Sequence, residues 1–142
     1  MTGEITFKDC EDTDIEYLLW LRKETMSLHL EKSGLDLDDE SHLKRIKYGF
    51  ENARLIFMDD KKIGLLKVGN LQEYIEIIQI QIDANYQGRG IGRKIIQSIV
   101  ENNLEKKPIQ LSVLKENRAK KLYKDLGFKI IGENQHSFIM EL

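Results

Sequence analysis

The sequence predicts a mixed α/β fold, in which helices pack against a β-sheet. Two observations lead to this class. Short apolar runs typical of strands are interspersed with segments in which apolar residues recur at helical spacing. No internal repeat or low-complexity linker divides the 142 residues, a length that suits one domain with a substantial core. We therefore expect a single domain over residues 1–142.

The N-terminal third is predicted to form one strand and two helices. The strand covers residues 4–8. The first helix runs from about 13 to 30, because "DTDIE" supplies capping residues before an apolar stripe that includes Leu18 and Leu21. The second helix, "DDESHLKRIKYGFEN" at 38–52, has three apolar residues at helical spacing: Leu43, Ile46 and Phe50.

The middle of the chain is predicted to form three strands and a helix. Strands at 54–58 and 62–69 are joined by the turn "DDKK", and a longer strand, "YIEIIQIQI", runs from 74 to 82. A glycine-rich loop follows. The helix after it has one continuous apolar face, made of Ile91, Ile95, Ile96, Ile99 and Val100.

The last third is predicted to form a strand, a helix and two closing strands. Pro108 begins the strand "PIQLSVL". Asn117 is expected to cap the next helix and Gly127 to end it. The closing strands are placed at about 128–132 and 136–141. The stripe of the intervening helix consists of Ala119, Leu122, Tyr123 and Leu126.

Composition and charge exclude several classes of protein. The net charge of -2 argues against a general nucleic-acid binder, which is normally basic. Apolar runs are too short for a membrane span, and "MTGEITFKDCEDTD" lacks the apolar core of a signal peptide. Cys10 is the only cysteine, which rules out an intrachain disulfide and a cysteine zinc cluster. We expect a cytoplasmic protein that binds neither membrane, nucleic acid nor metal; a homodimer is left open.

The loop "NYQGRGIGRK", residues 85–94, has the composition of an anion site. A helix N-terminus carries unpaired N–H groups, and glycines allow a phosphate to approach the backbone. Two known phosphate-binding patterns fail. The Walker loop needs Gly-Lys-Ser/Thr where Arg93 and Lys94 stand, and the dinucleotide fingerprint needs a glycine or alanine at Arg93. A generic nucleotide-binding domain is therefore disfavoured.

A third pattern, Gln/Arg-x-x-Gly-x-Gly/Ala, is met by Gln87, Gly90 and Gly92. A second segment, "NRAKKLYKDLGF" at 117–128, fits N-x-x-A-x-x-x-Y-x-x-x-G-F. With both motifs the chain resembles the GNAT superfamily of N-acetyltransferases, in element order over 4–142 and most specifically over 74–128. The resemblance implies a central mixed, mostly antiparallel sheet with splayed strands four and five, flanked by about four helices.

The resemblance also implies acetyl-CoA as the acetyl donor, with no metal. The pyrophosphate would lie on the backbone N–H groups of the glycine loop, and the pantetheine arm would pair with the strand before it. Arg89, Arg93 and Lys94 can bind phosphates or form a solvated basic face. The cofactor-binding residues implied are Ile80, Gln81, Ile82, Gln87, Gly88, Arg89, Gly90, Ile91, Gly92, Arg93, Asn117 and Tyr123.

The resemblance gives two residues a catalytic role. Tyr123 would lie near the CoA sulfur and protonate the departing thiolate, although its helical stripe also suits a core tyrosine. Glu76 falls where histone-type members carry a catalytic glutamate, so it is the candidate base. Alternation groups it with Ile78, Ile80 and Ile82, unless a bulge reverses its face; a strand-end glutamate in solvent is the alternative. Another alternative is a water chain that accepts the proton, with Glu24 or His29 as further candidates for the base.

The acceptor is predicted to be a primary amine that attacks acetyl-CoA directly in a ternary complex. It can be a small molecule or a peptide. The acidic segment from Glu31 to Glu40 either attracts a cationic amine or is plain solvated surface. The alternative function is a non-catalytic acyl-CoA-binding sensor or interaction module on the same fold, which would have lost its proton donor.

Overall fold

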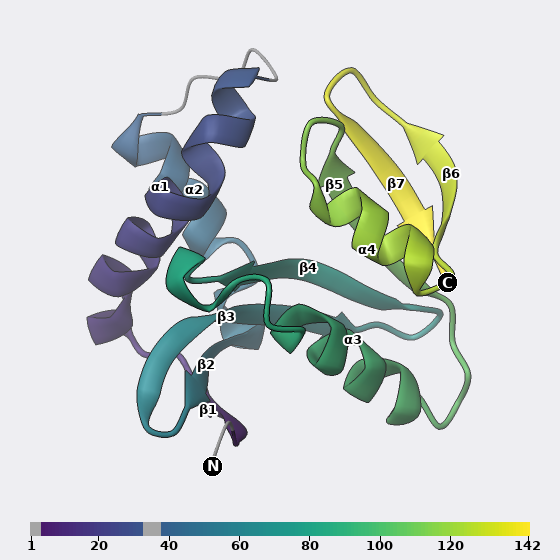
Figure 1. The fold of residues 1–142 in the computed structure, drawn as a ribbon, viewed down its shortest axis with the longest axis horizontal. Helices are drawn as coiled ribbons and strands as arrows, with labels where there is room; N and C mark the ends of the chain where they lie inside the picture. The colour runs from purple at the N-terminus through teal and green to yellow at the C-terminus, as the bar shows by residue number, and fades with distance from the viewer. Residues whose placement is uncertain (1–3, 33–37) are drawn as a thin grey trace.

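The computed structural model describes the backbone of residues 4–32 and 38–142, and the side chains of all of these except 26–32. Within these residues, seven strands form one sheet in the order β1-β2-β3-β4-β5-β7-β6 (Figure 1). The strands are β1 (Ile5–Asp9), β2 (Ala53–Met58), β3 (Lys61–Asn70), β4 (Ile75–Ile82), β5 (Ile109–Leu114), β6 (Lys129–Glu133) and β7 (Ser137–Glu141). The α-helices are α1 (Ile15–Lys32), α2 (Asp39–Lys47), α3 (Ile91–Glu101) and α4 (Ala119–Asp125).

The sheet is antiparallel except where β4 meets β5. These two parallel strands pair only over Ile75–Ile77 and 109–111. Beyond Ile77 they separate, and Figure 1 shows β5, β7 and β6 turning away from β4. The rest of β4 keeps its pairing with β3 but has no strand partner on its other edge. The predicted α/β class, with a mixed, mostly antiparallel sheet splayed between strands four and five, is confirmed.

The helices cover both faces of the sheet. On one face α1 and α2 pack on β2 and β3, with a buried cluster of Leu18, Leu21, Ile46, Ala53, Leu55 and Leu65. On the other face α3 packs on the same strands through Ile56, Ile63, Leu66, Ile91 and Ile95. A third cluster joins α3 and α4 to β4, β5 and β7, and its members include Ile96, Leu111, Tyr123 and Met140. None of the helices in the described residues is long and apolar enough to cross a membrane.

The second predicted helix is shorter than the periodicity suggested. α2 ends at Lys47, because Tyr48 is extended and Gly49 has a φ of 65°. That left-handed conformation suits glycine and stops the helix. Phe50 therefore lies in the 3-10 turn η2 (Phe50–Asn52), from which it still packs against the α1–α2 cluster. On α3, Val100 lies at the edge of the apolar face and is 39% exposed.

A bulge in β4 changes which of its residues share a face. The β3–β4 register shifts between Lys67 and Val68, whose partners are Gln79 and Ile77, so Ile78 is the extra residue. After the bulge, Ile80 and Ile82 pack on the α3 side together with Ile77. The expected grouping of Glu76 with Ile80 and Ile82 is therefore wrong: Glu76 alternates with Ile77 and lies on the opposite face.

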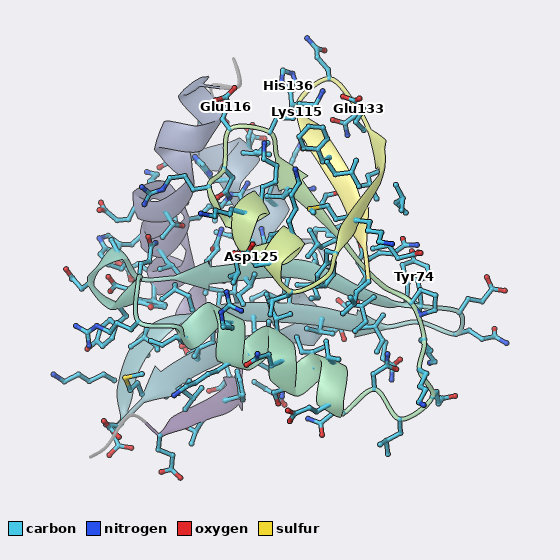
Figure 2. The ribbon with its side chains drawn as sticks, turned by 45° about the vertical axis from the view of Figure 1, so that its right-hand side comes forward. Tyr74, Lys115, Glu116, Asp125, Glu133 and His136 are labelled. Carbon is cyan, nitrogen blue, oxygen red and sulfur yellow. The ribbon has the colours of Figure 1, made fainter. Side chains whose placement is uncertain are left out.

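The loop before α4 is attached to the β6–β7 hairpin. Figure 2 shows Lys115 close to Glu133 and His136 at one end of the molecule. The backbone amide of Lys115 donates to the carbonyl of His136 at 2.9 Å, and its ammonium pairs with Glu133. These contacts fix the chain immediately before Asn117, where the second sequence motif begins.

Candidate functional site

Two cavities meet in the gap between β4 and β5. The larger, about 830 Å³, lies along the end of β4 and the N-terminal turns of α3 and α4. The smaller, about 380 Å³, includes side chains from α1, α2 and β5. Four residues line both cavities: Ile80, Gln81, Asn117 and Tyr123. These four residues therefore lie at the junction of the two cavities.

The glycine loop forms one wall of the larger cavity. Gly88 and Gly90 have φ values of 78° and 80°, and a Cβ added to either would meet no atom within 4 Å. Both glycines are thus needed for backbone conformation while leaving open space above them. Gly90 precedes the first turn of α3, whose N–H groups have no partner within a helix. This wall has the geometry of an anion site.

Side chains of the loop hold it in this shape. The Asp83 carboxylate accepts from the amide of Asn85 at 2.9 Å, and the Gln87 side chain donates to the carbonyl of Ile82 at 2.8 Å. The Arg89 guanidinium lies over the Tyr86 ring, 5.0 Å from its centre. Gln87 thus has a structural contact as well as its place in the cavity wall.

The basic residues of the loop are not equivalent. Arg93 lines the larger cavity, together with Gln87, Gly88, Gly90, Ile91 and Gly92. Arg89 and Lys94 are exposed and do not line it. Of the basic side chains predicted to meet phosphates, Arg93 is therefore the one that the structure places in the cavity wall.

Tyr123 is a core residue that also lines both cavities. Its ring packs on Phe128, with ring centres 5.9 Å apart, and the residue is 7% exposed. Burial raises the pKa of Tyr123 to about 12, so the phenol keeps its proton at neutral pH. Its hydroxyl makes no hydrogen bond within the described residues, although the residue lines both cavities. The sequence left open whether Tyr123 is a core tyrosine or a proton donor. In the structure the two roles are compatible.

Asn117 and Gln81 supply polar atoms at the same junction. The Asn117 side chain accepts from the amide of Ala119 at 2.9 Å, so it binds the first residue of α4, although the N-cap residue is Arg118, one position later than expected. Gln81 is 5% exposed, and its side-chain oxygen has no donor within the described residues. A buried acceptor without a partner costs roughly 1–3 kcal/mol, which a bound ligand can recover. In the sequence the signal was a glutamine within the apolar run "IIQIQI".

Arg22 and Arg45 line the smaller cavity, and sequence reasoning missed both. They are 23 positions apart (45 minus 22), on two helices, and come together only when α1 packs against α2. Arg22 is 4% exposed, and its Nε donates to Nδ1 of His42 at 3.0 Å. No local pattern in the sequence separates these arginines from ordinary basic residues of an exposed helix face.

The candidate bases occupy different places. Glu76 pairs across the sheet with Gly69 and Gln110 and lines neither cavity. Glu24 on α1 lines the larger cavity. The side chain of His29 lies outside the described residues. Of the carboxylates named from the sequence, Glu24 shares the lining of the larger cavity with Tyr123, and Glu76 does not.

The acidic segment is described only at its end, because residues 33–37 and the side chains of 31 and 32 lie outside the described part. Asp38 caps α2 by accepting from the amide of Ser41 at 2.9 Å. Asp39 forms an ion pair with Lys23 on α1. Within the described residues, no group of three His, Cys, Asp or Glu side chains is arranged to hold a metal ion.

Comparison with known proteins identifies the family. The sequence matches the acetyltransferase (GNAT) domain over residues 34–138, so the chain belongs to this family. The spermine/spermidine N(1)-acetyltransferase of Bacillus subtilis (strain 168) is 26% identical over 132 residues, which cover 79% of this chain and 84% of that protein. The N-acetylaspartate synthetase of Xenopus tropicalis is 30% identical over 88 residues, 58% of this chain. The match covers 32% of that relative, about a third of its length.

Solved structures share the fold. The crystal structure of PaiA N-acetyltransferase from Thermoplasma acidophilum in complex with coenzyme A superposes with a TM-score of 0.72 at 20% identity, covering 97% of this chain and 98% of that one. The predicted GNAT fold is thereby confirmed.

Proposed function

We propose that this protein transfers an acetyl group from acetyl-CoA to a primary amine by direct attack, with both substrates bound at once. The observation that carries the proposal is the position of Tyr123, a protonated phenol at the junction of two cavities. One cavity has an anion-binding wall suited to a phosphate-bearing donor, and the other is free for an acceptor. Membership of the GNAT family and a fold shared with a coenzyme A complex support the same assignment.

The larger cavity suits acetyl-CoA in three respects. The open space above Gly88 and Gly90 admits a phosphate to the backbone, and Arg93 adds a positive charge beside it. The unpaired edge of β4 after Ile77 offers backbone groups to a pantetheine amide. Ile80, Gln81 and Ile82 lie on this part of the strand and line the cavity, which supports their proposed role in binding pantetheine.

Acetyl-CoA supplies an activated thioester, and the chain must supply proton transfer. A lysine-like amine has a pKa of about 10.4, so its deprotonation at pH 7 costs about 4.6 kcal/mol. A cavity lined by Arg22 and Arg45 disfavours the ammonium form and offsets part of this cost. Tyr123 then donates its proton to the departing thiolate. Glu24, Glu76 or bound water accepts the proton of the amine.

The names of the relatives indicate two classes of acceptor. The name of the Bacillus subtilis protein specifies a polyamine acceptor, spermine or spermidine. That of the Xenopus tropicalis protein gives N-acetylaspartate, the acetylated form of an acidic amino acid. The two classes carry opposite charge beside the amine, so the electrostatics of the smaller cavity can distinguish them.

The alternative function is an acyl-CoA-binding sensor or interaction module without catalysis. The presence of Tyr123 at the junction favours the enzyme, because a non-catalytic module has no need of a proton donor there. A cytoplasmic location and a possible homodimer stay predictions from the sequence.

The proposal is tested by an acetyl-CoA turnover screen. Purified protein is mixed with acetyl-CoA and a panel of amines, and the release of free thiol is followed. Calorimetry with CoA measures binding separately. We expect CoA to bind and at least one amine to accelerate thiol release by tenfold or more. Tight CoA binding without acceleration by any amine would favour the sensor, and no CoA binding would overturn both functions.

A further inference from the structure

Arg22 is a buried cation without a carboxylate partner. No Asp or Glu within the described residues forms an ion pair with it, and no carboxylate raises its pKa. Its Nε is bound to His42, an acceptor whose pKa is lowered by its own burial and then by Arg22. The two terminal nitrogens of the guanidinium make no hydrogen bond within the described part of the chain. Buried charges in proteins are normally paired, so the two terminal nitrogens of Arg22, the fork of its guanidinium, lack an anionic partner.

A second arginine reinforces the positive charge. Arg45 lines the same cavity, and it lies near enough to lower the pKa of Arg22, which burial together with this repulsion brings to about 10. With a pKa of about 10, Arg22 keeps its charge at neutral pH. The described lining of this cavity contains no carboxylate to balance them. Two like charges held together in a cavity are stabilised when an anion binds between them.

A buried lysine binds the C-terminal end of α2. Lys67 has no exposed surface, and its ammonium donates to the carbonyls of Arg45 and Ile46 at 3.0 and 2.7 Å and to that of Tyr48. These bonds hold the C-terminal end of α2, and with it the backbone of Arg45, beside the sheet. The backbone that carries Arg45 is thus fixed, and the exposed Arg45 side chain extends from this support into the lining of the cavity.

On the basis of the proposed acetyl transfer, we infer that Arg22 and Arg45 form a carboxylate subsite, and that the acceptor is a small amine that also carries a carboxylate. Guanidinium groups bind carboxylates through paired N–H donors, which matches the free fork of Arg22. The amine end would then lie toward Tyr123, at the junction with the larger cavity, which we call the donor cavity because acetyl-CoA is proposed to bind there. A volume of about 380 Å³ suits an amino acid rather than a folded protein surface.

The charge of the cavity argues against a polyamine. A cationic chain placed beside two arginines meets like charges in a partly desolvated site, which costs several kcal/mol in general. The described acidic side chains of the 31–40 segment do not line either cavity: Asp38 caps α2, Asp39 pairs with Lys23, and Glu40 is exposed. The electrostatics therefore select an acceptor whose charge is opposite to that expected from the acidic segment of the sequence.

The first test compares matched amines. Glycine, alanine, β-alanine, aspartate and glutamate are assayed beside their carboxamides, with spermidine as the cationic probe. We expect kcat/KM for the best acid to exceed that of its carboxamide, and that of spermidine, by at least tenfold. Carboxamides or spermidine used as well as every acid would overturn the carboxylate subsite while leaving acetyl transfer intact.

The second test changes the arginines. Arg45→Gln should reduce kcat/KM for the best acid by 10- to 100-fold, mainly through KM. It should reduce kcat/KM for the matched carboxamide at least fivefold less, and leave the Kd for CoA unchanged. Lys44→Gln is the matched control, because it removes an exposed charge from the same helix without touching the cavity. Arg22→Lys keeps the charge but loses the fork, and should show the same selective loss. An Arg45→Gln effect no larger than that of Lys44→Gln would contradict the inference.

The third test does not depend on turnover. N-acetyl amino acids are titrated by calorimetry into protein saturated with CoA. We expect binding that weakens at least tenfold in Arg45→Gln and is unchanged in Lys44→Gln. Absence of binding by every N-acetyl amino acid overturns the subsite. Failure of CoA itself to bind would instead overturn the proposed function, so the two failures are distinguishable.

Discussion

The ammonium of Lys67 donates a hydrogen bond to the carbonyl of Ile46 at 2.7 Å, from a side chain with no exposed surface. Burial lowers the pKa of Lys67 from 10.5 to about 8, with Arg45 and Arg22 contributing repulsion. A lysine buried among cations is tolerated here because the carbonyls at the end of α2 have no other donor from their own helix. The same residue thus satisfies the helix end and fixes the helix that carries Arg45.

Lys67→Met should destabilise the fold. The substitution keeps the apolar stem but leaves three carbonyls without their donor, so we expect a loss of about 2–4 kcal/mol in the free energy of unfolding. Urea denaturation measures it. Lys61→Met, an exposed lysine on the same strand, is the control and should change stability by less than about 0.5 kcal/mol. Equal effects of the two variants would show that the bonds of Lys67 contribute no net stability.

Gly90→Ala should weaken the binding of CoA. An added Cβ meets no atom of the protein, so its cost to the fold is the backbone strain at a φ of 80°, about 1–2 kcal/mol. The same Cβ occupies the space that a phosphate needs above the first turn of α3. We expect calorimetry to show affinity reduced at least tenfold, and abolished in the bulkier Gly90→Val.

Gly127→Ala is the control for the strain in Gly90→Ala. Gly127 also has a positive φ, 104°, but does not line the donor cavity. CoA affinity should therefore be unchanged in this variant, whatever its stability. If Gly90→Ala binds CoA as tightly as the parent, the glycine loop is not the phosphate site.

Tyr123→Phe should reduce kcat by roughly 10- to 1,000-fold with little change in CoA affinity. The substitution removes the proton donor at the junction of the cavities and retains the ring packed on Phe128. Steady-state kinetics with the best acceptor from the screen measures the effect. An unchanged kcat would leave Tyr123 with a packing role alone.

The raised pKa of Tyr123 also predicts a dependence of stability on pH. The phenol ionises near 10 in the unfolded chain and near 12 in the folded one, so between these values the unfolded state holds fewer protons. Stability due to this group is therefore present below pH 10 and is lost as pH rises through 12. Urea denaturation should show the parent losing about 1 kcal/mol relative to Tyr123→Phe between pH 8 and 11. A constant difference between the two proteins would mean that the tyrosine is not desolvated.

Local sequence patterns predicted most of the fold because the main elements are defined by local chemistry. The apolar face of α3, the hydrogen bond from Ala119 to Asn117 at the start of α4 and the positive φ of Gly127 depend on near neighbours in the chain. The end of α2 was missed because helical spacing continues through Phe50 although Gly49 stops the helix. Phe50 packs against the same apolar cluster from the 3-10 turn η2, so its spacing in the sequence looks like that of a helix residue.

The parts of the site that escaped prediction depend on contacts between distant segments. The bulge at Ile78 arises from the register of β4 against β3, and it moved Glu76 away from the face of Ile80. Arg22 and Arg45 meet because α1 packs on α2. Neither relationship has a periodicity that a single sequence displays. The loop around Gly90 could be predicted because its chemistry lies within one short segment.

The last prediction concerns the base. If a carboxylate accepts the proton of the amine, kcat/KM should rise with pH to a plateau, and replacing that carboxylate by its amide should lower the plateau while preserving shape. Glu24 lines the donor cavity and Glu76 lines neither cavity, so we expect Glu24→Gln to lower the plateau by about 10-fold or more. Glu76→Gln should change it by less than about threefold. The pH profile of each variant is measured with the same acceptor, and CoA affinity is checked in both. A plateau lowered only in Glu76→Gln would restore the base predicted from the sequence, acting through water. If the plateau is unchanged in both variants, a water chain accepts the proton of the amine, because the glutamine side chains that replace the two glutamates cannot accept it.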